Sequence, residues 1–417
     1  NLKRLFNTYI KNNLGILNLF GKTLGRFLFL LLTSFFAYKL SFKDFAAFAI
    51  FWTTLRMLTF FSANNLYIIY FNEVRESLIN HKKWPANVSS NIALTVLVLG
   101  LLSSIISFFI FDSIWIAVLM FPSLVLFVLI RNIAEFSKSD NSVYLSIFIE
   151  DIVFYFLFFV IGISSVYIFN NLMGIVIALF LTIFITAITS LILFKNKFKF
   201  KINTFKIRPK DFSFKVFRLG INYTFLRGNE FLASFGARYL GQIYFGDIFV
   251  SYAHIMYQFY NLSALITMAV ISGLQSKITV KIDANFNKIF VKEMYVKILK
   301  TIIPVVFGII IIITLFNSQI LDLFFTKYTQ YNKLLVKVSF IGLIFMMVQP
   351  LVYILIYNNK ISNIRFLNLM QYFGITIVYV LPFIFPKFNE QYWLLMMMTI
   401  IITIQGVFAI VSYKTIR

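Results

Sequence analysis

The chain has no cysteine in its 417 residues, which excludes disulfide bonds and thiolate chemistry. Acidic residues are scarce, with 15 aspartates and glutamates against 38 lysines and arginines. Two histidines are present, and no His/Cys pattern has the spacing of a metal site. A glycine-rich phosphate loop ending in Lys-Ser or Lys-Thr is also missing. We therefore expect no enzymatic activity, no cofactor and no phosphate-loop energy coupling on this chain.

Apolar residues are abundant instead. Hydrophobic residues make up 60% of the chain, charged residues 13%, and the mean hydropathy is +0.87. Apolar runs of about 20 residues recur, which is the length needed to cross a hydrocarbon core of about 30 Å. Solid apolar blocks argue against the short alternating strands of a β-barrel. We predict an all-α membrane protein with about twelve spans, at 14–40, 44–72, 88–111, 113–134, 143–168, 172–194, 216–241, 247–276, 295–318, 333–358, 362–385 and 389–413.

The distribution of lysine and arginine predicts the orientation. Most of them lie in the N-terminal segment and in every second connection after it. The positive-inside rule then places both termini in the cytoplasm, and it supports an even number of spans. No small-residue cleavage site follows the first span, so we expect no removable signal peptide. The net charge of +23 is thus explained by topology, and nucleic acid is not an expected partner.

A basic stretch at 195–215 divides the spans into two sets of six. We predict an N-terminal lobe over 1–194, a cytoplasmic linker, and a C-terminal lobe over 216–417. The turn Phe42-Lys-Asp44-Phe-Ala-Ala-Phe-Ala49 is echoed by Phe245-Gly-Asp247-Ile-Phe-Val-Ser-Tyr-Ala253, as in transporters built from parallel repeats with a substrate site between the halves. The Lys/Phe alternation in the linker leaves two readings open: a solvated topology signal, or an amphipathic element on anionic membrane lipids.

Three cations lie inside the first two spans. Lys22 and Arg26 are one helical turn apart in the first span, and Arg56 is in the second. At 1.5 Å per residue, each arginine lies about 18 Å along its helix, which is close to mid-depth. A cation at that depth costs roughly 2.5–3.5 kcal/mol, so something must compensate it. We expect a water-filled cavity that receives an anion, with the guanidinium forks binding phosphate.

The seventh and eighth spans add polar side chains. Arg227 lies about 16 Å along its helix, at the depth of the first two arginines, and Glu230 follows one turn later. His254 and Gln258 lie in the eighth span. The candidate cavity or ion-coupling residues are Glu230, His254, Gln258, Glu150 and Asp151. Simpler readings remain open: Arg227 and Glu230 neutralise each other, and His254 is a hydrogen-bonded core residue rather than a proton carrier.

The charged and small residues of the first two spans also have local explanations. Lys22 is near enough to the cytoplasmic boundary to reach the headgroups. Arg56 can pair with Glu150 or Asp151, the acidic pair at the start of the fifth span. Gly21 and Gly25 form a small-xxx-small step, which favours close helix packing over a hinge.

The opening of the chain resembles that of the Wzx-type polysaccharide flippases of the multidrug/oligosaccharidyl-lipid/polysaccharide (MOP) exporter superfamily. The likeness lies in Phe20-Gly-Lys-Thr-Leu-Gly-Arg26-Phe-Leu-Phe-Leu-Leu-Leu-Thr33, in Phe45-Ala-Ala-Phe-Ala-Ile50, and in Ala237-Arg238-Tyr-Leu-Gly and Val250-Ser-Tyr-Ala253. The family often has Asp-Arg where this chain has Ala237-Arg238, and Gly-x-Tyr where it has Val250-Ser-Tyr. A role for that aspartate does not carry over.

The resemblance implies a bacterial inner-membrane protein with two six-helix lobes that rock between inward-open and outward-open states. It implies that the substrate is an undecaprenyl-diphosphate-linked oligosaccharide, with Arg26 and Arg56 at the positions that engage the diphosphate. Arg227 is added on depth and pseudosymmetry. Expected partners are this lipid-linked sugar, membrane lipids and the glycan polymerase machinery. The energy for transport would come from an H⁺ or Na⁺ gradient, from the membrane potential or from consumption of the product.

Two different functions are also compatible with the sequence. A cation-coupled multidrug exporter of the same fold should prefer acidic cavity residues, whereas the arginines here favour an anion. A membrane glycan polymerase or glycosyltransferase needs an acidic catalytic residue and a sizeable outer loop, and the expected outer connections are short.

Overall fold

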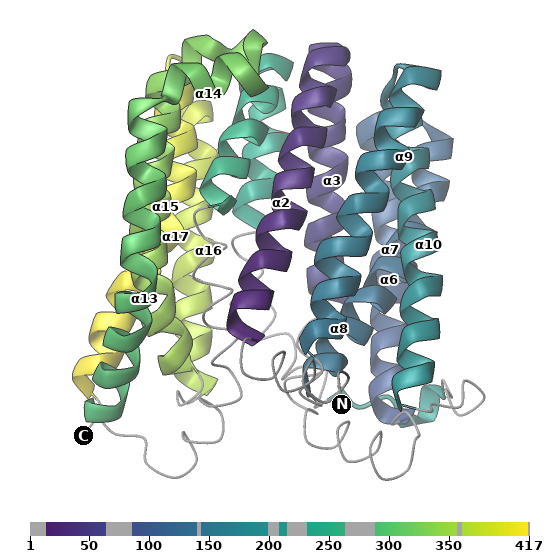
Figure 1. The fold of residues 1–417 in the computed structure, drawn as a ribbon, viewed down its shortest axis with the longest axis horizontal. Helices are drawn as coiled ribbons and strands as arrows, with labels where there is room; N and C mark the ends of the chain where they lie inside the picture. The colour runs from purple at the N-terminus through teal and green to yellow at the C-terminus, as the bar shows by residue number, and fades with distance from the viewer. Residues whose placement is uncertain are drawn as a thin grey trace, which may run out of the picture. The chain divides into compact units, whose positions relative to one another are not determined.

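The computed structural model describes residues 14–63, 86–139, 143–198, 208–214, 232–262, 288–356 and 361–415. Every regular element within these ranges is a helix (Figure 1). The first half contains α2 (Leu14–Lys39), α3 (Phe42–Ala63), α6 (Ala86–Phe111), α7 (Ile114–Ser139), α8 (Val143–Ile147), the π-helix η1 (Phe148–Val153), α9 (Phe154–Phe169) and α10 (Leu172–Phe198).

The second half contains two helical segments at 232–245 and 247–262 and six further elements. These are α13 (Lys288–Leu315), α14 (Asn317–Phe324), the 3₁₀ turn η4 (Thr326–Tyr331), α15 (Asn332–Ile356), α16 (Ile361–Ile384) and α17 (Glu390–Thr415).

Ten of the described helices are long and apolar enough to cross a membrane. They correspond to ten of the predicted spans; α8, η1 and α9 together form one of them. The seventh and eighth predicted spans are described in part, and those parts are helical. The chain is therefore an all-α membrane protein, as its sequence predicts.

The helices group into two compact units. Unit 1 comprises Asn1–Thr23, Thr33–Tyr38 and Leu232–Arg417, and unit 2 comprises Leu24–Leu32 and Lys39–Phe231. Helix α2 contributes to both, and its Ser34 donates a hydrogen bond to the Phe324 carbonyl within unit 1. The predicted lobe boundaries, with a linker at 195–215, stay a prediction.

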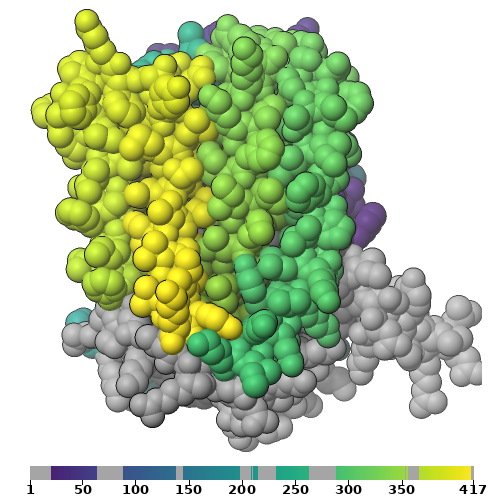
Figure 2. Space-filling view, turned by 90° about the vertical axis from the view of Figure 1, so that its left-hand side faces the viewer, coloured from purple at the N-terminus to yellow at the C-terminus, as the bar shows by residue number. Residues whose placement is uncertain are grey.

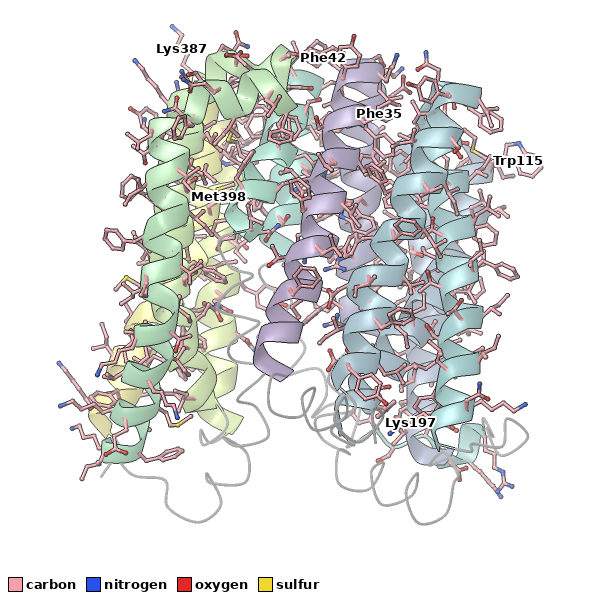
Figure 3. All side chains as sticks on the ribbon, in the orientation of Figure 1. Phe35, Phe42, Trp115, Lys197, Lys387 and Met398 are labelled. Atoms are coloured by element: carbon pink, nitrogen blue, oxygen red, sulfur yellow. The ribbon has the colours of Figure 1, made fainter. Side chains whose placement is uncertain are left out.

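Unit 2 packs α6 against α7, α9 against α10, and α3 against α6 and α7. Phe42 at the start of α3 and Lys197 near the end of α10 lie at opposite ends of this unit (Figure 3). Trp115 points away from it into the surroundings (Figure 3) and is 67% exposed. Exposed aromatic side chains of this kind are expected on a surface that lipid covers.

In unit 1, α15 packs against α13 and α17, and α16 packs against α17. Figure 2 shows the face that these helices form. Large apolar side chains such as Phe307, Ile311 and Phe373 are exposed on this unit. A water-soluble helix would carry polar residues on its outer side, so this surface also suits lipid.

The turn between α2 and α3 has a side-chain cap. Ser41 precedes α3, and its hydroxyl accepts a hydrogen bond from the Asp44 backbone N–H at 3.1 Å and donates to Asp44 Oδ2 at 2.6 Å. Asp44 Oδ1 also accepts from the Leu172 N–H at 3.4 Å, at the start of α10. The cap satisfies a free helix N–H group, and it holds the α2–α3 hairpin that carries both arginines of the candidate site.

A part of the basic linker is attached to α6. The Arg208 N–H donates to Ser90 Oγ at 2.8 Å, and the Ser213 N–H donates to Asn91 Oδ1 at 3.4 Å. Ser90 and Asn91 are buried. Buried polar side chains require such partners, so the linker around the short 3₁₀ turn η3 (Pro209–Asp211) is tied to unit 2.

Candidate functional site

Arg26 on α2 and Arg56 on α3 both lie against aromatic rings in unit 2. The Arg26 guanidinium carbon is 5.9 Å from the centroid of the Tyr155 ring, and that of Arg56 is 5.6 Å from the Trp52 ring. Both arginines are partly exposed. An arginine over an aromatic face keeps its charge while burying its stem.

The two arginines belong to one electrostatic cluster. Arg56 interacts electrostatically with Arg26, Arg131, Glu150 and Tyr155. Arg26 forms no ion pair with a carboxylate in the part of the chain that the structure describes. The fold thus brings together two of the cations that the sequence singled out, and their role in binding a ligand stays a prediction. Arg227, the third predicted member, lies outside the described residues, as does Glu230.

Trp52 belongs to a stacked aromatic core. Its ring lies 5.0 Å from Phe29, 6.1 Å from Phe154 and 6.0 Å from Phe158 between centroids. Trp52 is 5% exposed. Its main role is to fill the interior of unit 2 and to give Arg56 a rigid face.

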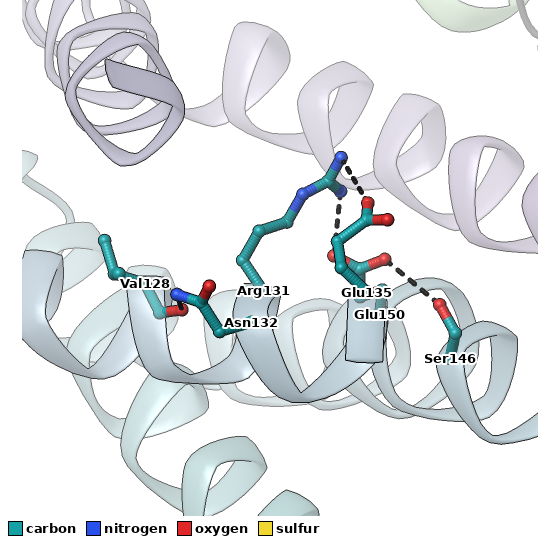
Figure 4. Close-up of polar contacts among 6 residues, drawn as sticks. All are labelled: Val128, Arg131, Asn132, Glu135, Ser146 and Glu150. Carbon is teal, nitrogen blue, oxygen red and sulfur yellow. Dashed lines mark hydrogen bonds and ion pairs between the residues drawn. The ribbon is translucent and has the colours of Figure 1, made fainter. Parts of the chain in front are cut away.

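Next to Arg56 lies an ion-pair network that the sequence did not predict (Figure 4). Arg131 on α7 donates from Nη1 to Glu150 Oε1 at 2.8 Å, and its Nη2 lies 3.1 Å from Glu135 Oε1. Ser146 Oγ also donates to Glu150 Oε2, at 3.4 Å. The signal in the sequence was the i, i+4 pair Arg131 and Glu135, which lies where the predicted fourth span gives way to a connection.

Glu150 and Asp151 lie in η1, a π-helical turn between α8 and α9. A π-helix shifts the residues that follow it around the helix, and such turns are frequent at functional sites. Glu150 was predicted as a partner of Arg56. It accepts hydrogen bonds from Arg131 and Ser146, and it also interacts electrostatically with Arg56.

Gly25 brings α2 close to η1. A Cβ atom at this position would overlap the Asp151 carbonyl oxygen and lie 2.8 Å from Tyr155 Cδ2. The close packing predicted for the small-xxx-small step is confirmed at Gly25. This contact sets how near Arg26, the next residue, lies to Tyr155.

We expect Gly25→Ala to destabilise unit 2 by about 1–3 kcal/mol, because the added methyl group must displace a backbone carbonyl. Gly308→Ala is the matched control, since no atom lies within 4 Å of a Cβ at that position. Unfolding in mixed micelles measures both variants. Equal stability of the two would contradict the packing role of Gly25.

The remaining predicted residues are distributed over unit 1. Lys22, on the part of α2 grouped with unit 1, is partly exposed. His254 and Gln258 are buried, at 0% and 9% exposure, in the helical segment 247–262. His254 Nε2 lies 3.2 Å from Gln258 Nε2.

Arg238 completes this second cluster, although in the sequence it stands out only within a family-like motif. It is 3% exposed, and its Nε donates to His254 Nδ1 at 3.3 Å. Its Nη1 donates to the Ser234 carbonyl at 2.8 Å and to the Ser234 hydroxyl. The guanidinium carbon lies 4.6 Å from the Tyr257 ring centroid. Among the described residues, the contacts of this buried arginine are to neutral groups, which is rare and marks the cluster as a candidate site.

Among the described residues, no group of three or more His, Asp or Glu side chains could hold a metal ion. The arginine cluster of unit 2 is suited to an anion, and the Arg238 cluster offers a titratable imidazole beside a cation.

No family model matches the chain, and no curated protein matches it. Several solved structures share its fold. An inward-facing multidrug resistance MATE family transporter of the MOP superfamily aligns with a TM-score of 0.67 and 15% identity, over 96% of each chain. An outward-facing transporter of the same kind aligns with a TM-score of 0.63 and 14% identity, over 97% of this chain and 93% of the other.

A third structure is a MOP superfamily transporter from Pyrococcus furiosus, for which the reverse polarity of the binding pocket suggests a different function. It aligns with a TM-score of 0.64 and 14% identity, over 97% of this chain and 94% of the other. At these identities the likeness concerns the fold alone. The chain thus has the fold of the MOP superfamily transporters along nearly its whole length.

Proposed function

We propose that the protein moves a lipid-linked oligosaccharide with a diphosphate headgroup from the inner to the outer leaflet by alternating access. The observation that carries this proposal is the pairing of Arg26 and Arg56. They lie on the two helices of one hairpin, in one electrostatic cluster, and both are partly exposed. Two guanidinium groups near one another repel, so an anion that binds both is favoured.

Arginine suits a diphosphate because its planar fork donates two parallel hydrogen bonds and stays charged at all physiological pH values. The neighbouring cation Arg131 is already bound to Glu135 and Glu150. Glu150 therefore has less charge to offer Arg56, and Arg26 has no carboxylate among the described residues. We expect the phosphate groups of the ligand to contact Arg26 and Arg56 within this cluster.

A cation-coupled multidrug exporter is the second candidate. The shared fold with multidrug resistance transporters favours it, and Glu135 and Glu150 place carboxylates inside unit 2. Against it, both carboxylates are engaged by Arg131. The Pyrococcus furiosus transporter supports the view that this fold accommodates a pocket of the opposite polarity.

Reconstitution into vesicles discriminates the two candidates. One set receives a fluorescent polyprenyl-diphosphate sugar, and its transfer between leaflets is read by dithionite quenching. The other set receives ethidium under a pH gradient. We expect protein-dependent transfer of the lipid and no ethidium movement. Ethidium transport without lipid transfer would establish the exporter reading instead, and a new glycosidic bond would indicate a polymerase.

The orientation belongs to the same proposal. Lys195 and Lys197 lie in the last turn of α10, at the start of the basic stretch at 195–215, and this end is the cytoplasmic one by the positive-inside rule. Both termini are then cytoplasmic in a bacterial inner membrane, and the glycan polymerase machinery receives the product on the other side. Cysteine-accessibility labelling of single-cysteine variants tests this directly, because the chain has no cysteine of its own.

A further inference from the structure

Arg238 and His254 lie at the same level of one helical hairpin in unit 1. The segments 232–245 and 247–262 are joined at Gly246, which has φ of 86°, a left-handed conformation that favours glycine. Each residue is eight positions from Gly246, or about 12 Å along its helix. The hairpin therefore brings the arginine and the histidine together within the membrane-spanning region.

The hydrogen bond between them fixes the protonation of the imidazole. A guanidinium nitrogen can only donate, so His254 Nδ1, which lies 3.3 Å from Arg238 Nε, must be the acceptor and carry no proton. The single proton of the neutral ring is then on Nε2, facing the Gln258 amide. An amide can present either its oxygen or its nitrogen, and its oxygen satisfies this tautomer.

A second proton cannot be added to His254 while Arg238 keeps its place. The imidazolium carries N–H groups on both nitrogens, so two donors and two positive charges would meet in a buried site. Arg238 has no carboxylate partner in the described part of the chain that could absorb the added charge. Its other contacts are Ser234 and the face of Tyr257.

The elements packed around the hairpin supply few other charges. The titratable groups facing it are Tyr328 and Tyr331 on η4, Tyr379 on α16 and Glu390 at the start of α17. Glu390 acts on Tyr252, two residues before His254, and Tyr379 acts on Tyr257. Tyrosines are neutral at physiological pH, so Arg238 is the charge that acts most directly on His254 among the described residues.

We propose that His254 is a proton-binding site whose occupancy is sensed by Arg238. Proton uptake breaks the Arg238–His254 hydrogen bond and expels the guanidinium from its contacts with Ser234 and Tyr257. The hairpin then has two discrete arrangements, one with a neutral imidazole and a docked arginine, and one with an imidazolium and a displaced arginine. Such a two-state element lets a proton gradient bias a transport cycle. This use of the site rests on the proposed function as a transporter, but proton binding itself does not.

The first test needs no substrate. The chain has two histidines, so His81→Gln leaves His254 as the only imidazole. Its ¹⁵N spectrum in detergent should show a bare Nδ1 and a protonated Nε2 at about pH 8. Acidification towards about pH 5 should protonate Nδ1 and shift the Arg238 Nε resonance in the same step. An imidazole that protonates without any change at Arg238, or that never protonates, overturns the proposal.

The second test concerns coupling. In vesicles with the fluorescent polyprenyl-diphosphate sugar, a pH gradient should accelerate transfer by about tenfold, a usual size for coupling between sites. His254→Gln and Arg238→Gln should remove this acceleration and retain downhill transfer, and Arg238→Lys should restore part of it. His81→Gln is the control and should keep the full acceleration. If His254→Gln keeps it as well, His254 is not the coupling site.

Failure of the proton-site proposal and failure of the proposed transport function give different results. Coupled ¹⁵N shifts without any lipid transfer would leave the proton site standing and overturn the proposed substrate. Size-exclusion chromatography of each variant shows that it is folded before it is scored.

Discussion

Replacing Arg26 or Arg56 by alanine is expected to reduce transfer of the lipid-linked sugar by about 100-fold, because each loses charge-assisted hydrogen bonds to a phosphate worth about 1.5–3 kcal/mol. The double variant should lose little more than either single variant, since both side chains act on one ligand. Lysine at position 26 keeps the charge without the bidentate fork, and we expect about a tenfold loss. The measurement is transfer in vesicles, together with complementation of glycan export in cells.

Arg208→Ala is the matched control for these changes. Arg208 is exposed, and its contact with Ser90 uses the backbone N–H, which alanine retains. Its transfer rate should match that of the unaltered protein. If the Arg26 and Arg56 variants transfer the lipid normally while the protein is in the membrane, the anion-binding role of the cluster is wrong.

Arg131→Met is expected to have the largest effect on stability. It leaves Glu135 and Glu150 without their shared cation, and their side chains are 7% and 14% exposed. Breaking a buried pair by removing one partner costs about 3–5 kcal/mol. Because the Arg131 side chain is itself 31% exposed, we expect a smaller loss, about 2–3 kcal/mol. Unfolding in mixed micelles measures the change.

The companion triple variant with Glu135→Gln and Glu150→Gln should recover most of this stability, since no charge is then left unpaired. Transport measurements should separate the effect of Arg131 on stability from its effect on the charge of the ligand site. In the single variant, Glu150 is freed to neutralise Arg56, so lipid transfer should fall beyond what the lost stability explains; in the triple variant it should return. A triple variant as unstable as the single one would show that packing, not charge, makes Arg131 important.

Much of the fold follows from local sequence. A run of about 20 apolar residues has one stable form in lipid, a helix, because every backbone polar group must be satisfied internally. This is why ten predicted spans appear among the described helices. The predicted spans 14–40 and 44–72 also placed a turn at 41–43, where the structure has Ser41 as the cap of α3. Helix α7 continues to Ser139, five residues beyond the predicted end of the fourth span at 134, and so includes Glu135, whose charge resembles that of a connection until its partner is known.

The candidate site residues also divide into those that local sequence predicts and those that only the tertiary structure reveals. Depth along a helix is a property of the sequence, and it identified Arg26 and Arg56. It could not identify Arg238, which lies nearer the end of its predicted span and resembles part of an outer connection, although it is 3% exposed. The family that the chain resembles often has an aspartate where this chain has Ala237. That difference did not indicate that the neighbouring Arg238 donates a hydrogen bond to the His254 imidazole.

The sequence by itself determined the class of the protein and most of its helical spans, and it singled out Arg26 and Arg56, because these depend on hydropathy and on rise per residue. Tertiary structure alone decided the partners: which carboxylates Arg131 holds, that Gly25 touches η1, and that Arg238 donates to His254. The reason is physical. Hydrophobicity acts on each segment separately, whereas an ion pair or hydrogen bond between helices requires a rotation and a register that only the packed fold provides.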